Sequence, residues 1–172
     1  KNGIPGLAMI FCNMRSTTDF VVKNLRLNGI NALAIHGGLT QNKRSSMISS
    51  FSNARASVLV CTDVASRGLH IENISYIYNY EMPRDSKDYV HRIGRTARAG
   101  ESGKVINLIS EQDHDSFARV LRDYSSFNIE KINTPKLERI TITKNDGFRP
   151  HGRVYNNENK RSNFRGGHNS RW

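Results

Sequence analysis

Two short, uninterrupted runs of apolar residues constrain the fold of this chain more than any other feature of its sequence. Residues 7–12 and 58–61 contain only aliphatic, aromatic, Met and Cys side chains. Such runs are typical of parallel β-strands buried on both faces, because a strand with one wet face alternates apolar and polar residues. The chain is therefore expected to contain a parallel sheet, whose strands need crossover connections of a dozen or more residues.

Predicted helices and further strands alternate along the chain, with short loops between them. The other strands are predicted at residues 32–35, 74–80 and 105–109, and helices at residues 16–28, 41–51 and 111–124. Thr40 and Ser110 are suitable N-caps for the second and third of these helices, and Asn28-Gly29 is a typical helix stop. This alternation predicts an α/β fold, an open parallel sheet flanked by helices with right-handed crossovers.

The size and charge of the chain limit its class of function. A length of 172 residues suits one domain with a sizeable core plus a tail. The net charge of +11 favours an acidic polymer as partner, nucleic acid before membrane. No apolar run is long enough to cross a bilayer and no signal peptide opens the chain, so no membrane partner is expected. The abrupt start at Lys1 suggests a piece of a longer protein.

The two cysteines are expected to be structural. Cys12 and Cys61 both fall in predicted buried strands, and they share no spacing typical of metal ligands. They are therefore expected to be reduced core residues of a cytoplasmic protein, neither a disulfide nor a metal site.

The composition changes near Asn145. Residues 145–172 contain six Lys/Arg, two Asp/Glu and four Gly, with few aliphatic residues. Such a segment cannot bury enough apolar surface to offset its ordering entropy, so residues 1–144 are expected to form the domain and the rest a disordered basic tail. Phe164 beside Arg165-Gly166-Gly167 suits stacking on bases and neutralising phosphates, although an inert solubilising tail fits the composition equally well.

Arginine recurs at every third position in one segment of the sequence. Arg92, Arg95 and Arg98 would share one face of a helix and form a cationic ridge with no acid among them. Because the guanidinium fork matches phosphate oxygens in a bidentate way, phosphate is the expected counterpart of this ridge. A solvated basic helix face is the alternative interpretation.

Polar residues and glycines follow several of the predicted strands. They are Asn13, the turn at residues 36–38, Thr62 with Asp63, and the segment near Asn79. Ligands of open α/β sheets bind beyond the carboxyl ends of the strands, which is where these residues are expected to lie. Paired glycines allow close approach of a backbone, and Thr62 can donate to an anion near a helix start. Ordinary turns and helix caps explain each of these residues as well.

In combination, these segments resemble a known family. The segments are Ile10-Phe11-Cys12-Asn13, His36-Gly37 with Gln41 and Arg44 spaced as Gln-x-x-Arg, and the runs at residues 59–68 and 89–100. In this order they resemble motifs IV, Q-x-x-R, V and VI of the C-terminal RecA-like domain of DEAD-box RNA helicases. The resemblance covers about residues 6–125. It implies an ATP-dependent RNA helicase that works as a monomer and binds RNA largely without sequence preference.

The resemblance also implies roles for individual residues. Arg95 and Arg98 match the arginines that reach the γ-phosphate of ATP, the latter as an arginine finger. His91 and Arg92 match residues that contact the partner domain and couple closure to hydrolysis. The positions that match the RNA phosphate track are Asn13, Gly37, Arg44 and Thr62. Those expected to support these contacts are Phe11, which packs beneath the motif VI arginines, Gln41, Asp63, Arg67 and Gly68.

Some features of the family are missing or changed. The chain has no phosphate-binding loop and no Asp-Glu-Ala-Asp segment, so ATP and Mg²⁺ are expected to be held mainly by an N-terminal RecA-like domain. This half alone is expected not to hydrolyse ATP. His70 stands where the family has an Asp that bonds the ribose, and Ala97 replaces a glycine of motif VI. His70 leaves open a non-catalytic RNA-binding or chaperone module, and a DNA-directed relative is a further alternative.

Overall fold

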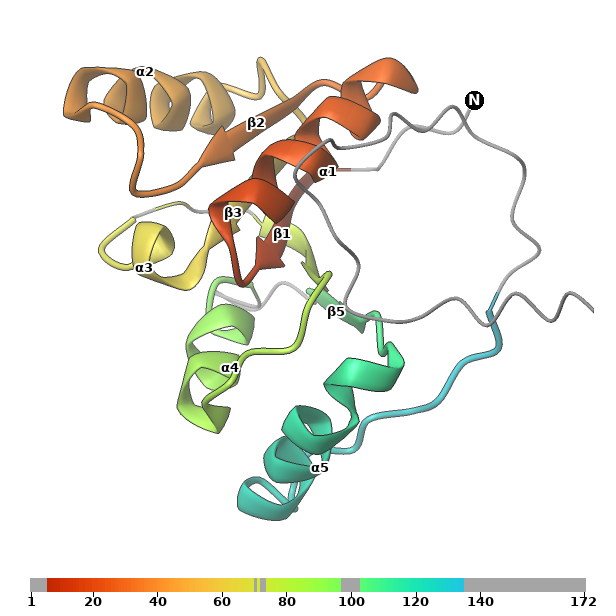
Figure 1. The fold of residues 1–172 in the computed structure, drawn as a ribbon. Helices are drawn as coiled ribbons and strands as arrows, with labels where there is room; N and C mark the ends of the chain where they lie inside the picture. Colours follow the sequence, from red (N-terminus) through yellow and green to blue (C-terminus); the bar gives the residue numbers. More distant parts are fainter. Residues whose placement is uncertain (1–5, 70, 72–73, 97–102, 135–172) are drawn as a thin grey trace, which may run out of the picture.

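The computed structural model describes residues 6–69, 71, 74–96 and 103–134. The predicted tail, His70 and Arg98 lie outside these residues. Within them, the chain forms one five-stranded sheet in the order β2-β3-β1-β4-β5. All four strand pairs are parallel, which confirms the predicted fold class (Figure 1).

The strands lie close to their predicted positions. They are β1 (Leu7–Cys12), β2 (Ala32–Ile35), β3 (Val58–Thr62), β4 (Ile74–Asn79) and β5 (Lys104–Asn107). The two uninterrupted apolar runs became β1 and β3, the central strands, and β3 is buried along its whole length. The last strand begins one residue earlier and ends two residues earlier than predicted.

Five α-helices connect or follow the strands in the described part of the chain. They are α1 (Arg15–Leu27), α2 (Gln41–Ser52), α3 (Asp63–Ser66), α4 (Ser86–Ile93) and α5 (His114–Asp123), the last preceded by a 3₁₀ turn, η1 (Glu111–Asp113). The predicted cap Thr40 is confirmed, since its hydroxyl accepts from the Lys43 amide. Ser110 forms a capping box with Asp113 at the start of η1, whereas the N-cap of α5 itself is Asp113. Gly29 ends the α1 region with φ of +78°.

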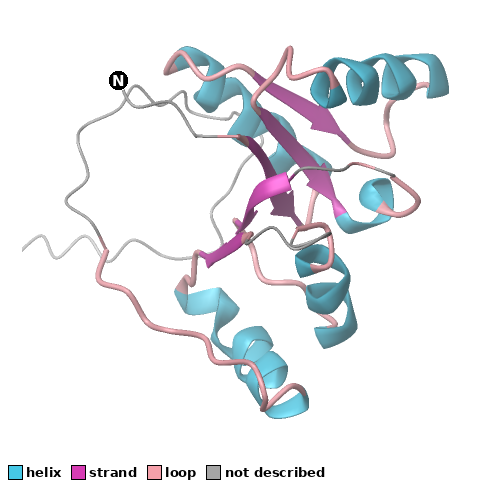
Figure 2. Cartoon of the chain, turned by 180° about the vertical axis from the view of Figure 1, so that it is seen from behind, coloured by secondary structure: helices cyan, strands magenta, loops and turns pink. Residues whose placement is uncertain are grey.

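Helices cover both faces of the sheet. Phe51 of α2 and Ala65 of α3 pack on one face with Met9 and Leu59. On the other face, α1 packs through residues such as Val21 (Figure 2). A third apolar cluster joins α4 to α5. Its fully or nearly fully buried members are Met82, Tyr89 and Val120. The helices and strands thus bring the loops after β1, β3 and β4 together at the carboxyl edge of the sheet.

The two cysteines are buried, free thiols, as predicted. Cys12 and Cys61 belong to the apolar clusters on opposite faces of the sheet. Burial raises the pKa of the Cys12 thiol to about 12 and that of the Cys61 thiol further still. Both thiols are therefore neutral at ordinary pH. Among the described residues, no helix combines the length and apolar character needed to cross a bilayer.

Candidate functional site

Arg92 does not lie on an exposed ridge, so that prediction is wrong. The helix α4 ends at Ile93, and Gly94 is its C-cap, so Arg95 follows the helix instead of sharing its face. The side chain of Arg92 points into the domain, where it is only 1% exposed. A charge at this depth requires partners, because an unpaired buried guanidinium would be strongly destabilising.

Asp63 supplies the main partner of Arg92. Nε of Arg92 donates to Oδ1 of Asp63 at 2.6 Å, and Nη2 donates to Oδ2 at 2.7 Å. This bidentate geometry is the strongest form of a guanidinium–carboxylate pair. The guanidinium also lies over the ring of Phe11, with its carbon 5.1 Å from the ring centroid. The acid that neutralises the arginine thus comes from the start of α3, 29 residues away in the sequence.

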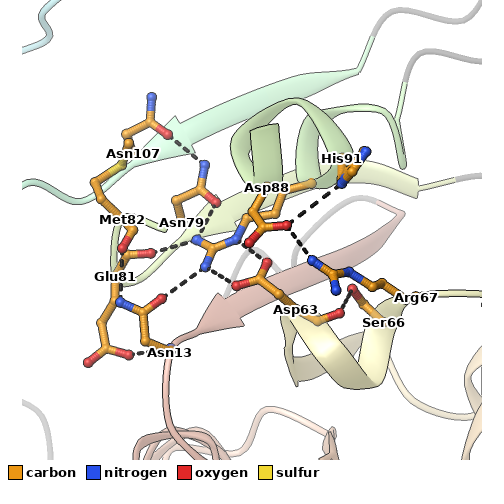
Figure 3. Close-up of polar contacts among 11 residues, drawn as sticks. Asn13, Asp63, Ser66, Arg67, Asn79, Glu81, Met82, Asp88, His91 and Asn107 are labelled. Carbon is orange, nitrogen blue, oxygen red and sulfur yellow. Dashed lines mark hydrogen bonds and ion pairs between the residues drawn. The ribbon is translucent and has the colours of Figure 1, made fainter. Parts of the chain in front are cut away.

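The remaining donors of Arg92 bind the loops after β1 and β4. Nη2 donates to the side-chain oxygen of Asn13 at 3.0 Å. Nη1 donates to the side-chain oxygen of Asn79 at 3.0 Å and to the backbone oxygen of Glu81 at 2.6 Å. One guanidinium therefore ties together the ends of β1, β3 and β4. We call Arg92 with Asp63, Asn13, Asn79 and Glu81 the Arg92 network (Figure 3).

Asn13 takes part in this network through its side chain and its backbone. Besides accepting from Arg92, its side chain donates to the backbone oxygen of Met82 at 2.9 Å. Its backbone amide donates to the carboxylate of Glu81 at 2.6 Å. The exposed side chain keeps a second N–H group for a ligand, so the RNA contact of Asn13 stays a prediction. The side chain supports the loop after β1, and neither its oxygen nor its amide nitrogen is left without a partner.

The polar chain continues from the Arg92 network across the sheet. The side-chain amide of Asn79 donates to the side-chain oxygen of Asn107 on β5 at 2.7 Å. Asn107 in turn donates to the hydroxyl of Tyr89 on α4 at 3.2 Å. Sequence reasoning did not assign a role to Asn107, Tyr89 or Glu81. The only signal was their position near strand ends or on the helix that carries Arg92, and this signal is not specific.

Residues at α3 connect this region to α2. Nη2 of Arg44 donates to the backbone oxygen of Ala65 at 2.9 Å, so its side chain holds the end of α3. Thr62 is the N-cap residue of α3, but its side chain makes no cap hydrogen bond. Gly68 adopts a φ of +73°, a conformation that glycine reaches without strain. The predicted supporting residue Gln41 lies exposed at the start of α2.

An exposed group of charges flanks the Arg92 network. Arg67 donates to Asp88 at 2.7 Å, with the Arg67 side chain 60% exposed. This hydrogen bond raises the pKa of the Arg67 guanidinium. His91 lies on the other side of Asp88, its Nδ1 3.7 Å from the same carboxylate oxygen (Figure 3). His91 is thus available on the surface of α4, in contrast to its neighbour Arg92.

Arg95 and Gly37 lie in different parts of the domain. Nη1 of Arg95 donates to the backbone oxygen of Leu69, beyond α3, at 2.8 Å, and the residue is half-buried. Gly37 follows β2, and the guanidinium of Arg15 lies against it, so a Cβ atom at this glycine would be 3.0 Å from Nη2. Sequence reasoning missed Arg15. In the described part of the chain, no cluster of three or more His, Cys, Asp or Glu residues could hold a metal ion.

Comparison with known proteins identifies the family of this chain. Residues 1–100 match the sequence profile described as "Helicase conserved C-terminal domain". The chain belongs to the helicase C-terminal domain family, in its DEAD-box branch. The resemblance predicted from the motifs is therefore confirmed, and the five-stranded sheet is the RecA-like fold of these domains.

Two curated relatives show the level of similarity. The chain is 45% identical over 112 residues to a Drosophila melanogaster protein named ATP-dependent RNA helicase DDX47, covering 65% of the chain and 22% of that protein. It is 40% identical over 124 residues to ATP-dependent RNA helicase RhlB of Xanthomonas axonopodis pv. citri, covering 72% of the chain and 21% of RhlB. The chain thus spans about a fifth of the length of these DEAD-box relatives.

Solved DEAD-box structures share the fold. The E. coli DEAD-box protein SrmB, solved with the regulator of ribonuclease activity A, gives a TM-score of 0.66 at 37% identity, over 86% of this chain and 79% of the solved chain. Domain 2 of Mss116p, solved bound to an RNA duplex, gives a TM-score of 0.64 at 31% identity, over 76% of this chain and 53% of that one.

Proposed function

We propose that this chain is the second RecA-like domain of an ATP-dependent RNA helicase that unwinds or remodels RNA duplexes. It supplies arginines to ATP held mainly on an N-terminal RecA-like domain, together with part of the RNA backbone track. The relatives named as ATP-dependent RNA helicases support this function. A monomeric state and a cytoplasmic location, the latter expected from the free thiols, stay predictions.

The Arg92 network is the observation that carries the proposal. Asp63 directly follows Thr62, the proposed RNA contact, and Arg92 is three residues before Arg95, the proposed ATP contact. The bidentate pair between Asp63 and Arg92 fixes these two segments to each other. If RNA binding shifts one of these segments, the position of the other segment therefore changes as well. Coupling of this kind is what an RNA-stimulated ATP hydrolase requires, since both ligands must favour the same closed state.

The residues present fit ATP only in part. Arg95 offers a half-buried guanidinium next to α4, and its fork suits phosphate oxygens. Arg98, the proposed arginine finger, lies outside the described residues. When ATP is bound, its γ-phosphate would be the transferred group, and Mg²⁺ would neutralise the charge of that group. Because the described residues lack a cluster of metal ligands, we assign the Mg²⁺ to the N-terminal domain.

RNA binding is proposed to depend on backbone contacts. Thr62, the turn at Gly37 and the positive charge of the chain all suit phosphates, not base edges. We therefore expect unrelated single-stranded RNAs to bind with similar affinity at fixed salt, and affinity to fall steeply as salt rises. A wide spread of affinities among such RNAs at one salt concentration would contradict this expectation.

ATP hydrolysis tests the proposal. The chain alone should be inactive, and the chain joined to a DEAD-box N-terminal RecA-like domain should hydrolyse ATP faster with RNA present. Arg98→Ala in the joined protein should lower turnover by a thousandfold or more. The matched control is Arg122→Ala, since Arg122 is 74% exposed on α5 and pairs only with the adjacent Asp123. RNA binding without any hydrolysis by the joined protein would favour the non-catalytic RNA-binding module instead.

A further inference from the structure

The turn at Gly37 and Gly38 is enclosed by two basic side chains. A Cβ at Gly37 would lie 3.0 Å from Nη2 of Arg15, and one at Gly38 would lie 3.2 Å from Nδ1 of His36. Neither glycine is among the described residues with positive φ. A side chain at either position would therefore crowd these basic groups, although no positive φ demands glycine there.

Both ring nitrogens of His36 have a partner. Nε2 lies 3.1 Å from Oδ1 of Asp19 on α1, and Nδ1 accepts from the backbone amide of Gly38 at 3.2 Å. A carboxylate can only accept and a backbone amide can only donate. These two contacts together are satisfied only by the neutral imidazole that carries its proton on Nε2.

Protonation of His36 must therefore change the turn. A proton on Nδ1 would face the N–H of Gly38, and two donors cannot share a hydrogen bond. The contact from Nε2 to Asp19 becomes charge-assisted at the same time, so the ring is held more firmly in place. The Gly38 amide is then released while the imidazolium stays where it is.

The charged side chains around His36 come from α1, one of the elements that pack against it. Arg15 and Asp19 come from α1, and Lys23 and Arg26 of the same helix line the cleft of about 520 Å³ next to His36. The loop before α2 and α2 itself contribute only Leu39 and Met47 to this cleft. Among the residues that the structure describes, Asp19 is the only acid that lines the cleft, and it is already paired with His36. The local field thus favours an anion.

We propose that His36 is a positioning residue for the RNA phosphate contact at this turn. The neutral ring of His36 accepts from the Gly38 amide, so this amide cannot donate to RNA. The protonated ring no longer accepts, and the amide can then donate to a phosphate oxygen beside Arg15. This inference rests on the proposed RNA-binding function. RNA binding then takes up a proton, so the affinity for RNA rises as pH falls.

The first measurement is the backbone amide resonance of Gly38 by NMR, without RNA, over a range of pH. We expect this amide to shift in step with the ring of His36, because its acceptor is lost when the ring is protonated. In His36→Gln, whose amide oxygen accepts at every pH, the shift should disappear. A Gly38 amide resonance that does not change when the ring of His36 is protonated would overturn the proposal.

The second measurement is the affinity for a single-stranded RNA oligonucleotide at about pH 7.5 and about pH 5.5, two values within the range where histidine is the side chain best suited to change charge. The wild-type chain should bind up to about tenfold more tightly at the lower pH, the effect of one added charge-assisted hydrogen bond. His36→Gln should lose this rise, and His114→Gln, a change at an exposed residue on α5, should keep it.

The outcomes separate the two proposals. Equal pH dependence of RNA affinity in the wild type and in His36→Gln would refute the role of His36 but leave RNA binding intact. No RNA binding by any of these proteins at either pH would refute the proposed function itself. Binding that rises with acidity only while residue 36 is histidine, together with a titrating Gly38 amide, supports both.

Discussion

Replacing Arg92 by methionine tests whether the Arg92 network stabilises the domain. Methionine has a similar length but no charge and no donor, so the change removes all five hydrogen bonds that Arg92 donates to Asp63, Asn13, Asn79 and Glu81. Because the arginine is only 1% exposed, water cannot take its place at the partners without rearrangement of the three loops.

The loss of stability in Arg92→Met depends on the partners that lose the guanidinium. Removing one partner of a buried ion pair typically costs about 3–5 kcal/mol, since the other charge loses its compensation. Asp63 is 20% exposed and regains some hydration, which lowers this cost. Asn79 is fully buried, and its side-chain oxygen would lose its donor, which adds about 1–3 kcal/mol. We therefore expect Arg92→Met to lower the free energy of unfolding by about 4 kcal/mol, a large share of the 5–15 kcal/mol typical of a domain.

Urea unfolding of the variants, with matched controls, measures this loss. Arg67→Met removes the exposed pair with Asp88 and should cost much less than Arg92→Met, because solvent screens exposed ion pairs. A double-mutant cycle with Asp63→Asn should give a coupling energy of about 2 kcal/mol or more, because the two side chains touch. Equal losses for Arg92→Met and Arg67→Met, or a coupling energy near zero, would refute the argument that this pair holds the loops together.

Three further changes test other parts of the structure. Gly68→Ala should destabilise the domain by about 1–2 kcal/mol in urea unfolding, and Gly68→Asn by less, because φ is +73° and no atom lies near a new Cβ. Phe51→Ala should cost about 3–5 kcal/mol by the same measurement, since this ring is fully buried between α2 and the sheet. The pKa of Cys12 is raised from 9.0 to about 12, so its neutral thiol stabilises the fold fully below pH 9.0 and loses this effect as pH rises toward 12. In that window the stability of the wild type should fall more steeply than that of Cys12→Ala, by up to about 1.4 kcal/mol per pH unit.

The sheet could be predicted from the sequence because a strand that is buried on both faces has an uninterrupted apolar run in its own sequence. The runs that became β1 and β3 are apolar at nearly every position, and Thr40 and Ser110 start helices by hydrogen bonds within four residues. The helix α3 has four residues, too few for a hydrophobic period to be seen, so the sequence indicated a helix start at Thr62 but not the extent of the helix. The helix α1 begins at Arg15 and not after Ser16, since its N-cap is Met14, whose side chain makes no cap bond.

The prediction of an arginine ridge was wrong for a different physical reason. A spacing of three residues places side chains on one face only while the helix continues, and α4 ends at Ile93. The exposed or buried state of an arginine is set by whether the fold brings an acid to it. For Arg92 that acid is Asp63, which lies in another segment and is brought near only by the parallel order of β3, β1 and β4. No local pattern in the sequence carries this information.

The same geometry changes how substitutions at this edge of the sheet must be interpreted. Asn13 and Asp63 both bind the guanidinium of Arg92, so replacing either one disturbs the position of the other and of the segment that leads to Arg95. A loss of RNA affinity in Asn13→Ala would therefore not show that Asn13 touches RNA. A double-mutant cycle in RNA affinity separates a contact from a positioning effect, because a positioning effect that acts through Arg92 is already lost in Arg92→Met and a direct contact is not. If Asn13 acts by position alone, Asn13→Ala lowers RNA affinity in the wild type but causes no further loss in Arg92→Met.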